Sequence, residues 1–174
     1  MLKLQIDDID SLPFPVYVLV AGGIGVGKTH VVRKNIRDIQ VMDLDDVMEE
    51  LGHRKYDSRN TSEAMNIITE RVEAVLERCE SMVAMGTSAN LPFSIDRLYG
   101  AKNRGYKTVL LHVDASIEQA VYQNELRREK GQRAVGPEES YKIHRTNQGA
   151  ANTVATLKDT DLVDYFIHHI NNPD

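Results

Sequence analysis

The most constraining feature of the sequence is a glycine-rich segment that directly follows a short apolar run. The run VYVLVA, residues 16–21, consists of strand-forming residues. The next residues, GGIGVGKT, match the pattern G-x-x-x-x-G-K-[ST] with Gly22, Gly27, Lys28 and Thr29. A strand, this motif and a following helix are together typical of the phosphate-binding loop (P-loop) of nucleotide-binding proteins. The segment therefore predicts a parallel α/β fold that binds a nucleoside triphosphate.

The chemistry of phosphate binding explains the spacing of this motif. Glycines lack a Cβ atom, so backbone N–H groups can turn toward the phosphates, and the following helix N-terminus adds partial positive charge. Lys28 can reach the β- and γ-phosphate oxygens, and the Thr29 hydroxyl can bind the Mg²⁺ that accompanies ATP. A simple glycine-rich turn is the alternative, and the order of strand, motif and helix argues against it. The residues predicted to contact the nucleotide are Gly22, Gly23, Gly25, Gly27, Lys28, Thr29 and His30.

Apolar strands and amphipathic helices alternate along the rest of the chain. This order predicts a P-loop NTPase fold of the α/β class, with a parallel five-stranded sheet, helices on both faces, and residues 1–174 in one domain. Thr61 is expected to cap a helix whose apolar stripe includes a buried Cys79. Strands are predicted at residues 16–21, 39–43, 81–86, 106–114 and 163–170. Helices are predicted at residues 28–37, 61–79, 93–102 and 116–129, and from Pro137 onward.

Composition and charge exclude several classes of protein. Apolar residues make up 41% of the 174 residues, which is enough for a hydrophobic core. No apolar run approaches the roughly 20 residues of a membrane-spanning helix, and the N-terminus has no apolar signal core. The one cysteine suits a reducing cytoplasm. A net charge of −5 argues against DNA binding by bulk positive charge but leaves room for a local basic groove.

The histidines show no recognisable metal-binding pattern in the sequence. The spacing of all six differs from that of zinc sites. His168 and His169 are adjacent within a predicted strand and should therefore point to opposite faces of the sheet. The histidine positions are 30, 53, 112, 144, 168 and 169.

An acidic turn follows the second predicted strand. The segment VMDLDD places Asp43, Asp45 and Asp46 at the carboxyl end of that strand, where ligands bind in open parallel sheets. A carboxylate there can accept the proton of an attacking hydroxyl or position it for transfer of the γ-phosphoryl group, with Asp46 on the acceptor side. Acidic residues in the first turn of a helix also stabilise its dipole, and this alternative stays open for some of the three.

Two further segments are candidates for contact with the acceptor of the phosphoryl group. Arg54, Tyr56 and Arg59 offer cations and an aromatic ring to a nucleotide or phosphodiester, although a solvated loop explains them equally well. Thr87 and Ser88 follow the third strand and offer hydroxyl groups, which could equally serve as helix caps.

A basic segment near residue 130 has the features of a lid. Two glycines flank a short polar loop, and Arg127, Arg128 and Arg133 lie within or just before it. Arginine side chains are planar donors that stabilise the charge of a phosphoryl group during transfer. We therefore expect a lid at about residues 127–137, and the alternative is a solvated helix end.

In the order of these segments the chain resembles the small P-loop kinases grouped around phage polynucleotide kinase and the zeta toxins. The resemblance spans roughly residues 16–157. It implies that Asp45 is the catalytic base, that Gly86 and Thr87 match the Gly-Thr or Asp-Thr strand end of these families, and that the arginines form a lid over the phosphates.

One position departs from the pattern of these kinases. Many relatives carry an acidic residue where this chain has Met85, and in the zeta toxins that acid helps to bind the sugar-nucleotide substrate. The departure leaves Asp43 to assist Mg²⁺ and argues against phosphorylation of UDP-N-acetylglucosamine.

Motifs and resemblance together predict an ATP- and Mg²⁺-dependent kinase that phosphorylates a hydroxyl group. The preferred acceptor is nucleic acid, through a 5′-hydroxyl or a 5-hydroxymethyl pyrimidine in DNA. The second type is included because related kinases occur in phages that hypermodify thymidine through 5-hydroxymethyluracil, in which case the protein would act in the host cytoplasm. The alternatives are a kinase for a small molecule, nucleotide or sugar nucleotide, and a nucleotide-dependent regulatory switch without acceptor chemistry.

Overall fold

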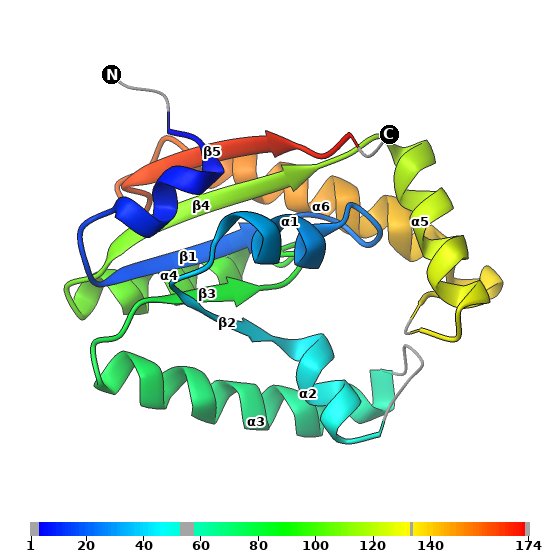
Figure 1. Ribbon diagram of the computed structural model, residues 1–174, viewed down its shortest axis with the longest axis horizontal. Coiled ribbons are helices and arrows are strands. Elements are labelled where there is room, and N and C mark those ends of the chain that lie inside the picture. The colour runs from blue at the N-terminus through cyan, green and yellow to red at the C-terminus, as the bar shows by residue number, and fades with distance from the viewer. Residues whose placement is uncertain (1–3, 53–57, 133, 173–174) are drawn as a thin grey trace.

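The computed structural model describes residues 4–52, 58–132 and 134–172, with only the backbone described for 58–60. One parallel sheet of five strands, in the order β2-β3-β1-β4-β5, forms its centre (Figure 1). The predicted α/β class and the five-stranded parallel sheet are confirmed. The strands are β1 Val16–Ala21, β2 Gln40–Asp43, β3 Met82–Met85, β4 Lys107–Asp114 and β5 Tyr165–Ile170.

Helices cover both faces of the sheet, as predicted. One core lies between the sheet and α2, α3, α4 and α6; the other contains residues from η1, α1, α5 and the start of α6. Figure 1 shows α1 and η1 in front of the sheet and α4 and α6 behind it. The helices are α1 Lys28–Asn35, α2 Leu44–Glu50, α3 Ser58–Glu77, α4 Leu91–Asn103, α5 Ile117–Glu129 and α6 Tyr141–Leu157, with 3-10 turns η1 Ile6–Ser11 and η2 Pro137–Glu139.

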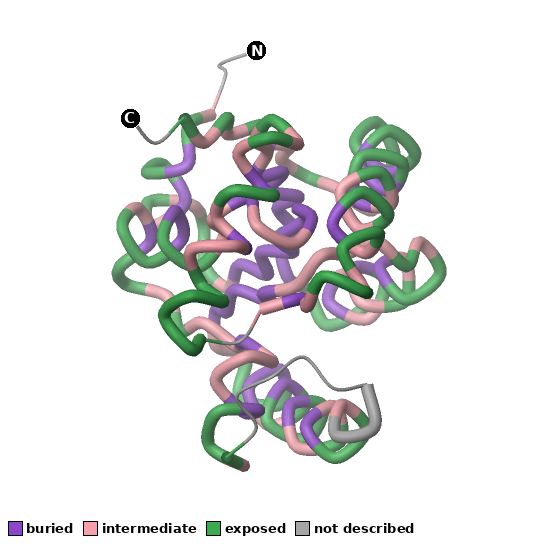
Figure 2. The backbone as a smooth tube through the Cα atoms, turned by 90° about the vertical axis from the view of Figure 1, so that its right-hand side faces the viewer, coloured by how far each residue is buried: buried purple, intermediate pink, exposed green. Residues whose placement is uncertain are grey.

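Strand β1 shows how the sequence produces this layering. All six of its residues are buried, and their side chains alternate between the two cores. Tyr17 and Leu19 pack toward α3, α4 and α6, whereas Val18 and Val20 pack toward α1. Figure 2 shows the same concentration of buried residues in the centre of the molecule. The strand that leads into the P-loop is therefore held from both sides.

Several predicted details were wrong. Helix α3 begins at Ser58, so Thr61 lies inside its first turns and does not cap it. Cys79 is exposed, because α3 ends at Glu77 and Cys79 adopts a left-handed conformation with φ of 54°. Pro137 opens a short 3-10 turn, and α6 begins only at Tyr141.

The remaining helix boundaries shift by a few residues. Helix α1 ends at Asn35, two residues before the predicted end, where the Asn35 side chain donates to the carbonyl oxygen of Val31. Ser116 caps α5 through a hydrogen bond from the backbone of Gln119. Within the described ranges, no helix is both long and apolar enough to cross a membrane.

Candidate active site

The P-loop connects β1 to α1 at the carboxyl edge of the sheet (Figure 1). Gly25 and Gly27 have φ angles of 88° and 87°, which any residue with a Cβ atom adopts only with strain. Gly22 lies against the backbone of β4, where a Cβ atom would be 2.5 Å from the carbonyl oxygen of Val113. The path of the loop therefore requires glycine at these positions, in addition to any contact with phosphates.

Lys28 is the first residue of α1, and its side chain folds back over the loop. Its Nζ donates a hydrogen bond of 2.9 Å to the carbonyl oxygen of Gly23. Burial lowers the pKa of Lys28 to about 8; the carboxylate of Asp43 opposes this shift and the guanidinium of Arg127 adds to it. Anionic phosphates beside the ammonium group would favour its charged form, so this environment suits a polyanionic ligand.

Thr29 and Asp43 bring two oxygen ligands together beside the loop. The Thr29 hydroxyl donates to Oδ2 of Asp43 at 3.3 Å, and Oδ1 of the same carboxylate accepts from the backbone N–H of Asp45 at 2.9 Å. Asp43 is buried and serves as the N-cap of α2. Hydroxyl and carboxylate oxygens are hard ligands, which Mg²⁺ prefers, so this pair fits the metal expected with ATP.

The three aspartates of the acidic turn have different surroundings. Asp43 ends β2, whereas Asp45 and Asp46 lie in the first turn of α2. Asp45 is partly buried. Asp46 forms an ion pair of 2.7 Å with Arg33, and both side chains are about half exposed. Asp46 therefore has an exposed cationic partner on α1.

The two described arginines of the predicted lid also differ. Both lie in the last turn of α5. Arg127 is close enough to Lys28 for its charge to lower the pKa of the lysine. Arg128 pairs with Glu125 on the same helix. Arg127 is therefore the arginine with an electrostatic link to the P-loop, while Arg133 lies outside the described residues.

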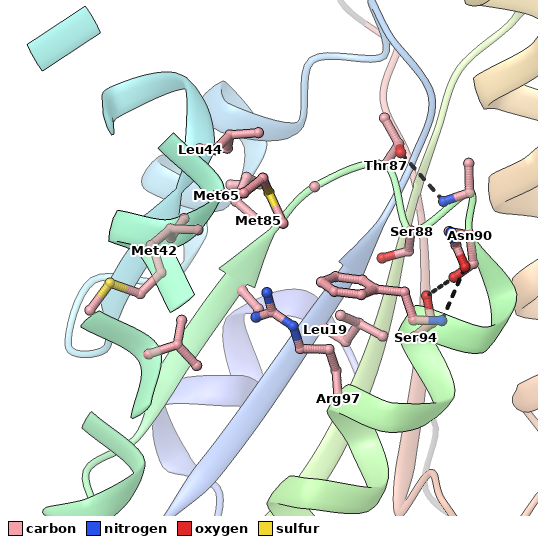
Figure 3. Close-up of a pocket in the computed structure, with 16 residues that line it drawn as sticks. Leu19, Met42, Leu44, Met65, Met85, Thr87, Ser88, Asn90, Ser94 and Arg97 are labelled. Carbon is pink, nitrogen blue, oxygen red and sulfur yellow. Dashed lines mark hydrogen bonds between the residues drawn. The ribbon is translucent and has the colours of Figure 1, made fainter. Parts of the chain in front are cut away.

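A pocket of about 210 Å³ opens between α3 and α4 (Figure 3). In Figure 3 the labelled methionines and Leu44 lie on one side of the pocket, and Thr87, Ser88, Asn90 and Ser94 lie on the other. The apolar lining residues include Leu19, Met42, Leu44, Met65, Ile68 and Met85. The polar groups are Thr87, Ser88, Asn90, Ser94 and Arg97.

The segment after β3 joins this pocket to the P-loop. The backbone N–H of Gly22 donates to the carbonyl oxygen of Thr87 at 3.1 Å, and the Ser88 hydroxyl donates to the carbonyl oxygen of Val20 at 2.7 Å. Thr87 and Ser88 both line the pocket, and their contact with an acceptor stays a prediction. The predicted acceptor contacts at Arg54 and Tyr56, and the side chain of Arg59, lie outside the described residues.

The P-loop and the pocket thus lie next to each other at the same edge of the sheet. The sequence profile of the Zeta toxin family matches residues 5–172. The chain belongs to the Zeta toxin family. Membership of this family supports nucleotide binding and nucleotide-dependent phosphotransfer as the chemistry of the site. No curated protein sequence matches the chain.

Solved structures share the fold of this Zeta toxin family member at low sequence identity. The PezAT toxin–antitoxin system of Streptococcus pneumoniae gives a TM-score of 0.66 at 15% identity, over 97% of this chain and 71% of that chain. A putative kinase from Chloroflexus aurantiacus gives 0.63 at 13% identity, over 91% and 89% of the two chains. The Pnkp1/Rnl/Hen1 RNA repair complex gives 0.66 at 17% identity, over 86% of this chain and 48% of that chain.

Strand register shows how the end of β3 differs from the end of β2. Met85 pairs directly with Asp43 on the neighbouring strand. Met85 lines the pocket, and Asp43 contacts Thr29 of the P-loop. This end of β3 therefore contributes an apolar surface to the pocket, and the carboxylate beside Thr29 comes from β2.

Three residues that the sequence did not single out, two in α6 and one directly after β5, form hydrogen bonds to the backbone of the P-loop. The Thr146 hydroxyl accepts from the backbone N–H of Ile24 at 3.0 Å, and the Asn147 amide donates to the carbonyl oxygen of Ile24 at 3.2 Å. The Asn171 amide donates to the carbonyl oxygen of Val26 at 2.8 Å. We call Thr146, Asn147 and Asn171 the loop clamp. No local motif marks these polar residues, so only the tertiary arrangement reveals them.

Proposed function

We propose that this protein is an ATP- and Mg²⁺-dependent kinase that phosphorylates a hydroxyl group of an acceptor bound in the pocket of Figure 3. The observation that carries the proposal is the direct connection between the P-loop and the pocket, through the hydrogen bond from Gly22 to Thr87. A nucleotide in the loop and a molecule in the pocket would meet at one edge of the sheet, where ligands of parallel α/β proteins bind.

The residues in and around the P-loop have the following proposed roles. The loop amides and Lys28 bind the triphosphate, and Thr29 holds Mg²⁺ with Asp43 next to it. Bound Mg²⁺ neutralises developing negative charge on the transferred group. Asp45 accepts the proton of the acceptor hydroxyl, and its hydrogen bond to that hydroxyl positions the oxygen for attack on the γ-phosphorus of ATP. Arg127 approaches the phosphates from the end of α5 and stabilises the moving phosphoryl group.

We further propose that residues 1–174 act as one kinase unit with a lid at about 127–137. Arg127 supports this idea, because its charge reaches Lys28 from a helix end that precedes a glycine-bearing turn. Lid closure would exclude water from the phosphates and so favour transfer over hydrolysis.

The walls of the pocket favour an acceptor with a flat ring. Phe93 lines the pocket, and Cζ of Arg97 lies 4.5 Å from the centroid of its ring. Arg97 lies at the pocket wall, where its charge also acts on the buried hydroxyl of Tyr17, and we propose that its guanidinium contacts the acceptor as well. An apolar pocket with a few directional polar groups is typical of small-ligand sites. We therefore propose a nucleotide acceptor, either free or within nucleic acid, whose base enters the pocket.

Family membership supports a second candidate, a sugar nucleotide. The two candidates differ at the position of Met85, where an apolar side chain lines the pocket. A thioether offers little to the hydroxyl groups of a sugar, because it is only a weak hydrogen-bond acceptor. We therefore rank the nucleobase-containing acceptor with a reactive 5′-hydroxyl or 5-hydroxymethyl group above the sugar nucleotide.

Transfer of label from γ-labelled ATP tests this ranking. The acceptors would be 5′-hydroxyl oligonucleotides, DNA containing 5-hydroxymethyluracil, free nucleosides and UDP-N-acetylglucosamine, with Lys28→Met as the inactive control. We expect labelled nucleoside, nucleotide or nucleic acid. Transfer to UDP-N-acetylglucosamine alone would reverse the ranking, and slow hydrolysis without any transfer would favour a regulatory switch.

A further inference from the structure

Two histidines and an aspartate, none of which has a proposed role in the kinase, meet at the carboxyl ends of β4 and β5. His112 on β4 and His168 on β5 are direct partners in the parallel register. Asp114 follows two residues after His112, so it lies on the same face of the strand. Adjacent strands thus place three metal-ligating side chains on one face of the sheet, although Asp114 and His168 are 54 residues apart in sequence.

The ligand atoms of these side chains are close together. One ring nitrogen from each histidine and one carboxylate oxygen of Asp114 all lie within 4.8 Å of one another. The imidazole rings of His112 and His168 stack with centroids 4.9 Å apart, and Nε2 of His168 lies 3.2 Å from Oδ2 of Asp114. The other oxygen, Oδ1, accepts from the backbone N–H of Ala115, which orients the carboxylate.

These distances suit a metal ion once side-chain rotations turn the stacked imidazole rings so that their nitrogens converge on it. Zinc binds nitrogen and oxygen ligands at about 2.0–2.2 Å, so ligand atoms in a tetrahedral site lie roughly 3.3 Å apart. The His168–Asp114 pair already has this separation. His112 is only 8% exposed, whereas the His168 and Asp114 side chains are 41% and 42% exposed. The two exposed ligands have room to adjust around the buried one, and an ion can enter from solvent.

We propose that His112, Asp114 and His168 form a binding site for a divalent transition-metal ion, with Zn²⁺ as the best match. Imidazole nitrogen selects Zn²⁺ and similar ions over Mg²⁺, which prefers oxygen ligands. Three protein ligands leave a coordination position for water. The site is separate from Thr29 and Asp43, which follow β1 and β2, whereas these ligands belong to β4 and β5.

The position of the site connects it to the P-loop. The backbone N–H of Asn171 donates to the carbonyl oxygen of Asp114 at 2.7 Å, and its side chain donates to Val26 in the loop. A metal ion bound by Asp114 and His168 would tie the end of β5 to β4 directly before Asn171. The ion would therefore stabilise one contact of the loop clamp.

Metal titration of the full-length, tag-free protein tests the site without reference to catalysis. We expect one Zn²⁺ per chain by calorimetry, and visible absorption bands of four-coordinate Co²⁺ that disappear when Zn²⁺ is added. An excess of Mg²⁺ should not compete. His168→Asn and Asp114→Asn should each weaken Zn²⁺ binding by about tenfold or more, because loss of outer partners alone costs about 10–100-fold.

Control substitutions outside the proposed site should leave Zn²⁺ affinity unchanged. His169→Asn changes the neighbouring histidine on the other side of β5 and should leave Zn²⁺ affinity unchanged. Thr29→Val should also bind Zn²⁺ normally, which separates this site from the Mg²⁺ site. His112 is buried, so the two exposed ligands carry the test if His112→Asn does not fold. No stoichiometric Zn²⁺ binding, or equal affinity in wild type, His168→Asn and Asp114→Asn, would overturn the proposal.

Discussion

The P-loop and the pocket are joined by one hydrogen bond, yet they are built in opposite ways. The loop is a short continuous segment whose backbone is fixed by positive φ angles and by the loop clamp. The pocket is assembled from β1, β2, α2, α3, β3, the segment after β3 and α4, with residues spread from Leu19 to Arg97. A nucleotide would therefore be recognised mainly by backbone groups, and an acceptor by side chains.

This difference has a consequence for evolution and for mutagenesis. Recognition by backbone groups changes little when side chains outside the motif change. The nucleotide site in the P-loop can therefore persist while the pocket changes to fit other acceptors. Variants on the loop side should reduce transfer to every acceptor. Variants in the pocket should discriminate between acceptors and leave ATP affinity unchanged.

The largest effect is expected for the proposed base. Asp45→Asn should lower single-turnover transfer by about 10²–10⁴-fold, because general-base assistance contributes that much, while ATP affinity changes little. Asp46→Asn is the matched control, since Asp46 is ion-paired with Arg33 and should cost far less. A near-normal rate for Asp45→Asn with a collapse for Asp46→Asn would move the base to Asp46.

A second large effect is expected for the loop lysine. Lys28→Met removes a cation from the transferred phosphates and should reduce turnover by about 10²–10³-fold with all acceptors. Lys34→Met, at the exposed end of α1, is the control and should behave as wild type. Circular dichroism checks that both variants fold. Wild-type turnover in a folded Lys28→Met protein would contradict the role of the P-loop.

A variant in the pocket should weaken acceptor binding without changing ATP binding. Arg97→Met keeps the aliphatic stem but removes the guanidinium, and should raise the KM for the acceptor by roughly 10–100-fold, as expected for hydrogen bonds to a charged group. ATP affinity should not change. Arg104→Met, which breaks the exposed ion pair with Glu73 and leaves the pocket intact, is the control. Equal weakening of ATP and acceptor binding would mean that the P-loop and the pocket do not bind their ligands independently.

The smallest effect is a dependence of ATP affinity on pH. Lys28 has a pKa of about 8 without nucleotide, and phosphates should raise this value in the complex. ATP affinity should therefore be constant below pH 8 and fall above it, by at most about tenfold per pH unit, with proton uptake on binding. Calorimetry in buffers of different ionisation enthalpy measures both quantities. In Lys28→Met, ATP affinity should no longer fall above pH 8. A rise in the ATP affinity of the wild-type protein from pH 8 to 9 would contradict this prediction.

The parts of the molecule that the sequence predicted well are those with contiguous determinants. The strand before Gly22, the P-loop and α1 are specified within one short segment, and alternating apolar runs located the other strands. Cys79 was misplaced because helical spacing continues past Glu77, and no glycine marks the left-handed turn that ends the helix.

The contacts between distant segments could not be predicted from the sequence. His112 and His168 meet only because β4 and β5 pair in a particular register. Asn147 and Asn171 look like ordinary surface residues until α6 and β5 are placed behind the loop. The pocket walls likewise depend on how α3 and α4 pack on the sheet. In each case the determining information is strand register or helix packing, which local patterns do not contain.

The loop clamp also determines when the nucleotide site can form during synthesis. The loop lies near the beginning of the chain, but its clamping residues come from α6 and from the segment after β5. Strand β1 also pairs with β3 and β4 and not with the strand that follows it in sequence. A nascent chain therefore carries its glycine-rich motif long before the residues that fix its shape have been translated. We expect the complete phosphate site to appear only after the last strand docks, as one of the late events of folding.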